Sequence, residues 1–550
     1  TRHVVLSALC IRILVAILTW TVFQPDEYFQ ALEPAHYLVF GYGHLTWEWR
    51  TSKPIRSILY PALNIPIYWA LKWTGLDQLD SLGTQLVIAG PRVLHGCFAA
   101  LTDIFLCRLT SKVLGDRYVS SALFVSLTSF FHVLALSRSF SNSLETSLAT
   151  IAFSYYPWLP ADHIAFDRTA LLRLFLFAAL ACAVRPTNAI IWVYLIGTLL
   201  WRVRHSTRSV VTVVSTGLVV GIATLLGIFI LDSWFYGEPT FTPFNFLATN
   251  LSNVSLFYGG SPWHYYLSQA VPILCTTSLV FVLREIRCTV QSSAPSPLKT
   301  ALGCVVWTIS VYSLAGHKEW RFIHPILPLL HVFAAKSLYD MTAVHAAKGF
   351  NSLSKRFFFS PGFLLWLNVP VSCFVALSYC SAPIQVMAFL RSLPDIESGG
   401  VGFLMPCHST PGHAFLHRPG LANGKMWALG CEPPLQHQDL TTYRDQTTVF
   451  FSSPTTYLRE RFPGSVDPSF PVSPFPVSIP GRPDIVEYAW LHEWPQYLVF
   501  FGALLEQSAA RELLSQRGYE EIWTAGRSWE GDSDTRKGGV RVWKYNIIST

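Results

Sequence analysis

Residues 4–22 read VVLSALCIRILVAILTWTV, an apolar run of the length that crosses a bilayer, and the chain leaves it through Gln24-Pro25-Asp26-Glu27. Carboxylates are costly to hold beside hydrocarbon, so two acids where a membrane segment ends indicate a functional site. The segments 28–33 and 41–50 that follow are rich in aromatic residues and acids, which is typical of a chain lying along the membrane surface. An interfacial anchor is the alternative interpretation, because Trp and Tyr belts occur on membrane proteins of every function.

Composition places the whole chain in the membrane class. Of its 550 residues, 51% are hydrophobic and only 13% are charged, whereas a soluble domain carries roughly 25% charge. The net charge of +7 would suit nucleic acid in a soluble protein, but here the basic residues sit in short loops between apolar runs. That pattern argues against a nucleic-acid partner. The eleven Cys follow no metal-ligand spacing, and most lie within apolar runs.

Eleven apolar runs predict eleven transmembrane helices, with boundaries soft by a few residues. They cover 4–22, 88–110, 118–136, 144–159, 169–184, 187–201, 210–231, 265–283, 300–315, 322–340 and 358–380. A twelfth run, 58–75, contains Pro61 and Pro66, which disfavour a regular helix. A full span there would also place the later basic loops on the wrong side of the membrane, so we interpret this run as a membrane-dipping or lumenal helix.

Basic loops set the predicted orientation. The loops near residues 108–117, 168–173, 202–208, 284–299 and 348–356 carry Lys and Arg, which places them on the cytoplasmic side. Alternation then places the N-terminus in the cytosol. It places 23–87, 137–143, the turn at Arg185, 232–264, 317–321 and everything from 383 onward in the lumen.

The predicted domains are a multi-span catalytic unit, 1–382, whose first lumenal loop region is 23–87, and a lumenal C-terminal domain, 383–550. From about residue 401 the chain becomes rich in Pro, Gly and charge, and it ends in the strand-like stretch 540–545. Residues 491–517 read as one or two helices. Together these features predict a small α+β domain.

Acids and bases gather in the predicted lumenal segments. Asp26 and Glu27 lie on one of them, and His317, Lys318 and Arg321 lie on another. Arg offers phosphate a bidentate fork and Lys a compact charge, so the second segment suits a lipid-linked phosphate. An acid facing it would act as general base toward a sugar hydroxyl. A snorkelling basic loop is the alternative, and its position away from the cytoplasm argues against it.

Three motifs carry a specific resemblance. They are PDEYFQALE at 25–33, TWEW at 46–49 and HKEWRF at 317–322. They resemble the endoplasmic reticulum (ER) mannosyltransferases that use dolichyl-phosphate mannose and have the GT-C fold. LMPCHSTP at 404–411, FTPFNF at 241–246 and the stretch 258–266 are similar to the branch that adds the third mannose of the glycosylphosphatidylinositol (GPI) core. Gln24 departs from the His that many members carry before Pro-Asp-Glu.

The resemblance implies a polytopic helical GT-C protein of about eleven spans, with amphipathic lumenal helices after the first. It implies inverting transfer from dolichyl-phosphate mannose, in α-1,2 linkage, to the second mannose of a GPI precursor, with no obligatory metal. Transfer to an N-glycan precursor remains the alternative in the same class, and a lipid or sugar transporter the alternative outside it. Ionisable residues at span ends rather than mid-membrane argue against the transporter.

The same resemblance implies residue roles. Asp26 would be the base, and Glu27 would orient the acceptor or the base. His317, Lys318 and Arg321, with Arg185, would hold the donor phosphate. The expected substrate contacts are Glu33, Trp47, Glu48, Trp49, Asn245, Tyr258, Trp263, His264 and Glu319.

Two further hypotheses concern the lumenal segments. Cys407 and Cys431 could form a disulfide in an oxidising lumen, which we favour over a zinc site made with His408. The sequons at Asn250 and Asn253 could carry N-glycans, or their side chains could serve structure or acceptor contact instead.

Overall fold

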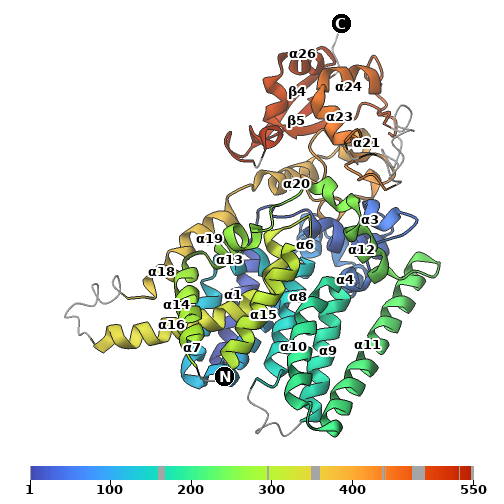
Figure 1. The fold of residues 1–550 in the computed structure, drawn as a ribbon. Helices are drawn as coiled ribbons and strands as arrows, with labels where there is room; N and C mark the ends of the chain where they lie inside the picture. Colours follow the sequence, from blue (N-terminus) through green and yellow to red (C-terminus); the bar gives the residue numbers. More distant parts are fainter. Residues whose placement is uncertain are drawn as a thin grey trace.

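The computed structural model describes residues 2–158, 167–293, 296–347, 360–435, 439, 441–473, 490–531 and 533–546. A bundle of helices carries a smaller domain at one end, and the N-terminus lies at the opposite end (Figure 1). Helices α3 (Trp47–Arg50) and α12 (Thr242–Leu251), which belong to two of the predicted lumenal segments, lie between the bundle and the small domain (Figure 1). The segments that the basic loops assign to one side therefore meet at one end of the molecule.

Each of the eleven apolar runs forms helix. The bundle helices are α1 (Arg2–Leu18), α6 (Asp80–Leu114), α7 (Val119–Leu127), α8 (Ser141–Tyr155), α9 (Arg168–Val184), α10 (Ala189–Val203), α11 (Thr207–Tyr236), α13 (Val271–Cys275), α14 (Leu279–Gln291), α15 (Pro297–Ser313), α16 (Leu327–Ala347), α18 (Phe363–Trp366) and α19 (Asn368–Leu377). By length and composition alone, five helical stretches of the described chain could cross a membrane: 80–114, 207–236, 266–291, 320–345 and 363–392.

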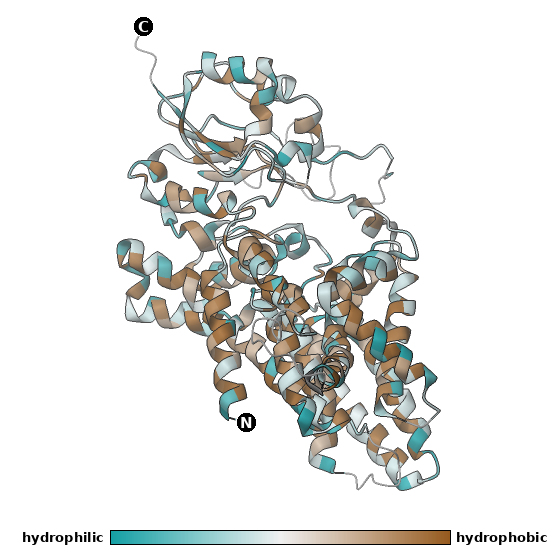
Figure 2. Cartoon of the chain, turned by 90° about the vertical axis from the view of Figure 1, so that its left-hand side faces the viewer, coloured by the Kyte–Doolittle hydropathy of each residue, from teal (hydrophilic) through white to brown (hydrophobic). Residues whose placement is uncertain are grey.

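Apolar side chains face outward from the bundle. On α11, Leu218, Val219 and Ile230 are more than half exposed. The hydropathy colouring shows that the bundle helices are rich in apolar residues (Figure 2). In water this surface would be unfavourable, whereas lipid tails solvate it. The chain is a multi-pass membrane protein.

The first loop region folds into short helices rather than another span. A π-helical turn, Tyr28–Leu32, follows the Asp26-Glu27 pair and leads into α2 (Glu33–Phe40), α3 (Trp47–Arg50), α4 (Leu59–Ala62) and α5 (Ile65–Thr74). The ambiguous run 58–75 thus forms two helices. Helix α5 has 10 residues, about half the length that crosses a bilayer.

The C-terminal part contains a five-stranded mixed sheet of order β2-β1-β3-β5-β4. The strands are β1 (Val401–Phe403), β2 (Met426–Ala428), β3 (Tyr497–Phe501), β4 (Tyr519–Ala525) and β5 (Val540–Tyr545). Strand β1 pairs in parallel with β2 and β3, and β5 pairs antiparallel with β3 and β4. The helices of this part are α20 (Ala382–Ser392), α21 (Ile396–Gly399), α22 (His413–Leu416), α23 (Gln446–Ser452), α24 (Pro454–Arg461) and α26 (Ser508–Gln516).

Of two predictions for this domain, the structure confirms one and contradicts part of the other. The strand at 540–545 is confirmed as β5. The helical interpretation of 491–517 is wrong for its first part, because Tyr497–Phe501 forms the central strand β3, buried on both faces. Continuous burial removes the alternation that identifies a strand in sequence. The division of the chain at 382/383 stays a prediction.

Glu33 joins the C-terminal part to the first loop region. Its Oε1 accepts a hydrogen bond from the Ala414 backbone N–H at 2.6 Å, and its Oε2 accepts one from the His44 N–H at 2.8 Å. A Cβ at Gly412 would lie 2.8 Å from Glu33 Oε1, so a larger residue there would displace the Glu33 carboxylate from these hydrogen bonds. The carboxylate predicted to contact substrate is fully buried at this joint.

Burial of Glu33 gives stability a pH dependence. Burial raises the pKa of Glu33 to about 7 from 4.5, although the backbone N–H groups of His44 and Ala414 oppose the shift. The folded state therefore holds a proton that the unfolded chain releases. The free energy of unfolding should fall, on the order of 3 kcal/mol, as the pH rises from about 4.5 through 7. Denaturation of the purified protein in detergent between pH 5 and 8 measures this slope.

Glu33→Gln should flatten that pH dependence, whatever its effect on absolute stability, because the amide does not titrate. Glu512→Gln, at an exposed position of α26, is the matched control and should keep the wild-type slope. An unchanged slope in Glu33→Gln would contradict the assignment.

Candidate active site

A cavity of about 500 Å³ opens at the end of the bundle that faces the C-terminal domain. Its walls come from the residues after α1, the loop around α3, the turn after α9, the 246–258 region and the loop before α16, together with Cys407, His408, Cys431 and Arg536 of the C-terminal part. Lining residues include Asp26, Trp47, Glu48, Arg56, Arg185, Asn250, Tyr258, His317, Lys318, Glu319, Arg321, His408 and Arg536. The fold thus brings most of the predicted site residues to one place.

Arg321 links the two predicted motifs. Its Nη1 donates to Asp26 Oδ2 at 2.7 Å, and its Nη2 donates to Glu319 Oε1 at 2.8 Å. The guanidinium fork fixes the Asp26 carboxylate through one oxygen and leaves the other for a substrate hydroxyl. Asp26 therefore has the geometry of a positioned base.

The neighbouring cations are also held in place. His317 donates from Nδ1 to the Gly259 carbonyl at 2.9 Å, and its Nε2 lies 3.2 Å from Glu319 Oε1. The hydrogen bond to Glu319 raises the pKa of His317, which favours the cationic ring. Burial alone would raise the pKa of Glu319, but Arg321 and His317 lower it to about 2. Lys318 donates to the Ser261 carbonyl at 2.8 Å.

Glu27 faces away from this cavity. Its Oε2 lies 3.0 Å from Arg138 Nη1, and both side chains are almost fully buried. Arg138 also donates to the backbone carbonyls of Thr21 and Leu134. The geometry gives Glu27 an indirect role, holding the segment before Asp26. Arg138 was missed from sequence, although it lies in the predicted lumenal stretch 137–143.

Two more ion pairs hold arginines that line the cavity. Arg185 lies 3.4 Å from Glu145 and donates to Ser141 Oγ at 3.2 Å. Arg56 lies 2.6 Å from Glu48. Sequence reasoning missed Arg56 and Glu145, and a basic residue within the predicted lumenal loop was the available signal for Arg56.

Several predicted substrate contacts lie elsewhere. The Trp49 indole donates to the Phe29 carbonyl at 3.1 Å, and the ring lines a smaller pocket beside Arg185. Asn245 donates to the Pro54 carbonyl at 3.0 Å. Trp263 is 72% exposed and His264 bonds Ser268, both outside the cavity lining. None of these four residues lines the cavity.

Of the two sequon asparagines, the structure describes the side chain of Asn250 only. The Asn250 side chain lines the cavity and donates to the Phe246 carbonyl at 2.8 Å. Asn250 is an exposed residue, and its role as glycan acceptor or as a structural or acceptor-contact residue stays a prediction. The Asn253 side chain lies outside the described residues.

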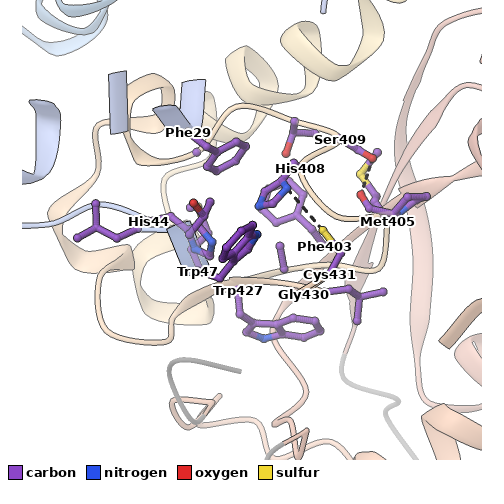
Figure 3. A pocket seen from close by; sticks show the side chains of 18 of the residues that line it. Phe29, His44, Trp47, Phe403, Met405, His408, Ser409, Trp427, Gly430 and Cys431 are labelled. Carbon is purple, nitrogen blue, oxygen red and sulfur yellow. Dashed lines mark hydrogen bonds between the residues drawn. The ribbon is translucent and has the colours of Figure 1, made fainter. Parts of the chain in front are cut away.

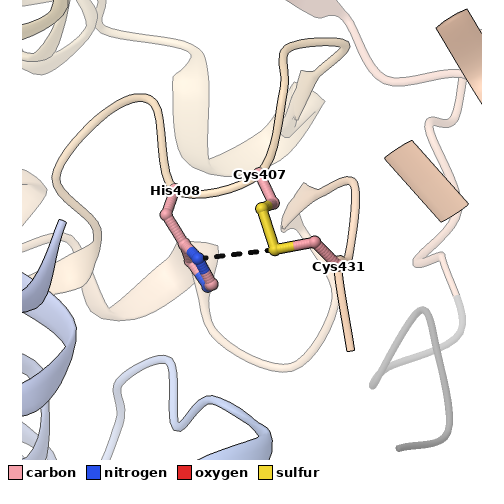
Figure 4. A group of neighbouring side chains, drawn as sticks. All are labelled: Cys407, His408 and Cys431. Carbon is pink, nitrogen blue, oxygen red and sulfur yellow. Dashed lines mark hydrogen bonds between the residues drawn. A yellow bond between two sulfur atoms is a disulfide. The ribbon is translucent and has the colours of Figure 1, made fainter. Parts of the chain in front are cut away.

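Cys407 and Cys431 are joined in a disulfide, with their Cα atoms 5.8 Å apart (Figure 4). His408 Nδ1 lies 3.7 Å from Cys431 Sγ, so the three residues form a compact group. Sulfur atoms bonded to each other are not thiolate ligands. In this disulfide form the group is therefore a structural link at the cavity wall.

The fold and the site define a membrane-embedded glycosyltransferase of the GT-C class. The solved structure of ArnT from Cupriavidus metallidurans bound to undecaprenyl phosphate is similar, with a TM-score of 0.58 over 99% of this chain and 98% of that one. At 12% sequence identity, this likeness concerns the fold alone.

The chain belongs to the Alg9-like mannosyltransferase family, whose family model matches residues 3–417. Relatives named GPI mannosyltransferase 3 share 34% identity in Yarrowia lipolytica (98% of this chain, 95% of the relative) and 31% in Debaryomyces hansenii (97% and 90%). The human GPI alpha-1,2-mannosyltransferase 3 shares 33% identity over 84% of this chain and 77% of its own length. The predicted GT-C fold class and enzyme family are confirmed, and the number of about eleven spans stays a prediction.

Proposed function

We propose that this enzyme transfers mannose from dolichyl-phosphate mannose, in α-1,2 linkage, to the second mannose of a GPI-anchor precursor. The names of its relatives support this acceptor over an N-glycan precursor. The observation that carries the chemistry is the Asp26–Arg321 pair, which places an acid beside cations in one cavity. The proposed setting is the ER membrane, with the N-terminus cytosolic and the site and C-terminal domain lumenal.

A continuous path suits the lipid-linked donor. An apolar groove of about 490 Å³ runs between α9, α10, α11 and α12 (Thr242–Leu251). It shares Ala183, Pro186 and Pro243 with the small pocket beside Arg185. That pocket in turn shares Arg56 and Arg185 with the main cavity. A prenyl chain in the groove would bring its phosphate to these two arginines and its sugar into the cavity.

The reaction then needs one displacement. The acceptor hydroxyl oxygen attacks the anomeric carbon of the donor mannose, and Asp26 takes the hydroxyl proton. The bond from that carbon to the phosphate oxygen breaks with inversion, and dolichyl phosphate leaves with both electrons. Arg56 and Arg185, together with Lys318, Arg321 and protonated His317 of the same cavity, stabilise the charge that develops on the phosphate. These fixed cations can replace a metal in that task, so no divalent metal is required.

An assay with purified enzyme, dolichyl-phosphate mannose and a two-mannose GPI precursor tests the proposal. The expected product carries a third mannose that an α-1,2-mannosidase removes, and its formation is unchanged by EDTA. A matched reaction offers an N-glycan lipid precursor in place of the GPI precursor. Extension of the N-glycan precursor alone would overturn the acceptor assignment, and loss of activity with EDTA would overturn metal-free transfer.

A further inference from the structure

Another pocket, distinct from the small one beside Arg185, adjoins the main cavity. Figure 3 shows the side chains that line it. It lies between the first loop region, at residues 44–50, and the C-terminal segments 403–412 and 426–432. Its volume is about 60 Å³, room for roughly four to six waters. It shares Phe29, Thr46, Trp47, His408 and Cys431 with the cavity, so a ligand in the cavity can extend into it.

The lining of this pocket is rich in aromatic rings, and its two imidazoles are uncharged. Phe29, Trp47 and Trp427 form part of its walls, with the rings of His44 and His408 between them. Burial lowers the pKa of His44 to about 3 and that of His408 to about 4, so both imidazoles are uncharged at neutral pH. Neutral imidazoles donate and accept hydrogen bonds without attracting an anion.

Charge separates this pocket from the donor end of the site. Its charged lining residues, Arg50 and Glu432, have opposite signs, whereas Arg56, Arg185, Lys318 and Arg321 line the main cavity and not this pocket. A phosphate therefore belongs at the arginine end. The aromatic faces suit the C–H face of a sugar, and the imidazoles and backbone groups suit its hydroxyls.

Thr46 supplies a separate observation. Its side chain is 95% buried, at the junction of the pocket and the cavity, and its Oγ1 has no hydrogen-bond partner in the described part of the chain. It precedes α3 but makes no capping bond. A buried hydroxyl without a partner costs free energy, and a ligand hydroxyl would remove that cost.

The walls are held in position before any ligand binds. The Cys407–Cys431 disulfide ties the two C-terminal segments together, and Glu33 bonds the backbone at His44 and at Ala414. A pocket fixed in this way binds without paying for loop ordering.

We propose that this pocket is an acceptor subsite that holds a neutral sugar ring of the acceptor glycan other than the mannose that is extended. The identity of the acceptor rests on the proposed function. The ring stacks against the aromatic walls, and one of its hydroxyls bonds Thr46 Oγ1.

Two variants test the subsite through the KM for acceptor. Thr46→Val keeps the side-chain volume and removes the hydroxyl, which should raise the KM for the two-mannose GPI precursor by about two- to tenfold. Ala428→Phe fills the pocket from β2 and should raise that KM about tenfold or more. The donor KM should change by less than about twofold in both variants. Ala422→Phe, at a half-buried position outside the pocket, is the control.

A short acceptor distinguishes loss of binding in this subsite from a general loss of enzyme activity. With an α-linked mannose disaccharide, which lacks the rest of the glycan, both variants should match the wild type. Unchanged KM values for the precursor, or equal increases for precursor and disaccharide, would overturn the subsite alone. A wild-type enzyme that extends neither acceptor would overturn the proposed function, and the subsite with it.

Discussion

Asp26→Asn should lower the rate of mannose transfer by about 10²- to 10⁴-fold, the usual contribution of a general base. The amide keeps the size of the carboxylate but cannot take the proton from the acceptor hydroxyl. Arg321 loses a charged partner and keeps Glu319, 2.8 Å away, so the cavity should persist. Steady-state kinetics with purified protein measures the change in kcat, and binding of the lipid donor should be retained.

Asp395→Asn is the control for this experiment. Asp395 is also paired with a cation, Lys544 at 2.9 Å, but the pair lies in the C-terminal domain. Its substitution should leave transfer within about twofold of wild type, as expected for a partly exposed ion pair. Transfer by Asp26→Asn at the wild-type rate would remove Asp26 as the base.

Arg138→Met should destabilise the protein by about 3–5 kcal/mol, because it leaves the Glu27 carboxylate buried without its partner. The lost hydrogen bonds to Thr21 and Leu134 add to the cost. Chemical denaturation in detergent, followed by intrinsic Trp fluorescence, measures the free energy of unfolding.

The double variant Arg138→Met/Glu27→Gln separates structure from chemistry. Removing both charges should restore much of the stability lost in the single variant. If Glu27 acts only by holding the segment before Asp26, transfer should recover with the fold. The double variant could instead regain its stability while its transfer rate stays as low as that of Glu27→Gln. That result would indicate that Glu27 contacts the acceptor directly.

Much of the site could be predicted because topology constrains it. Asp26 and Arg321 are 295 positions apart in the chain, yet alternation of spans put both on one side, and their side chains lie 2.7 Å apart. Periodicity could not find Arg138 or Arg56, because a basic residue in a short loop has the same sequence signature whether it faces water, lipid or a buried acid. Glu33 and Glu27 both belong to the motif at 25–33, which marks them as candidate site residues. Only their contacts in the folded protein show that their roles are structural.

The sequence by itself determined the membrane class, the helical runs, the family motifs and the side on which the acids and bases meet. These follow from hydrophobic run length and loop charge, which are local properties of the chain. Tertiary structure alone decided which acid faces the cavity, which one is buried against Arg138, and how the C-terminal segments close a pocket against 44–50. Such choices depend on pairwise distances and desolvation, and those exist only once distant segments pack together.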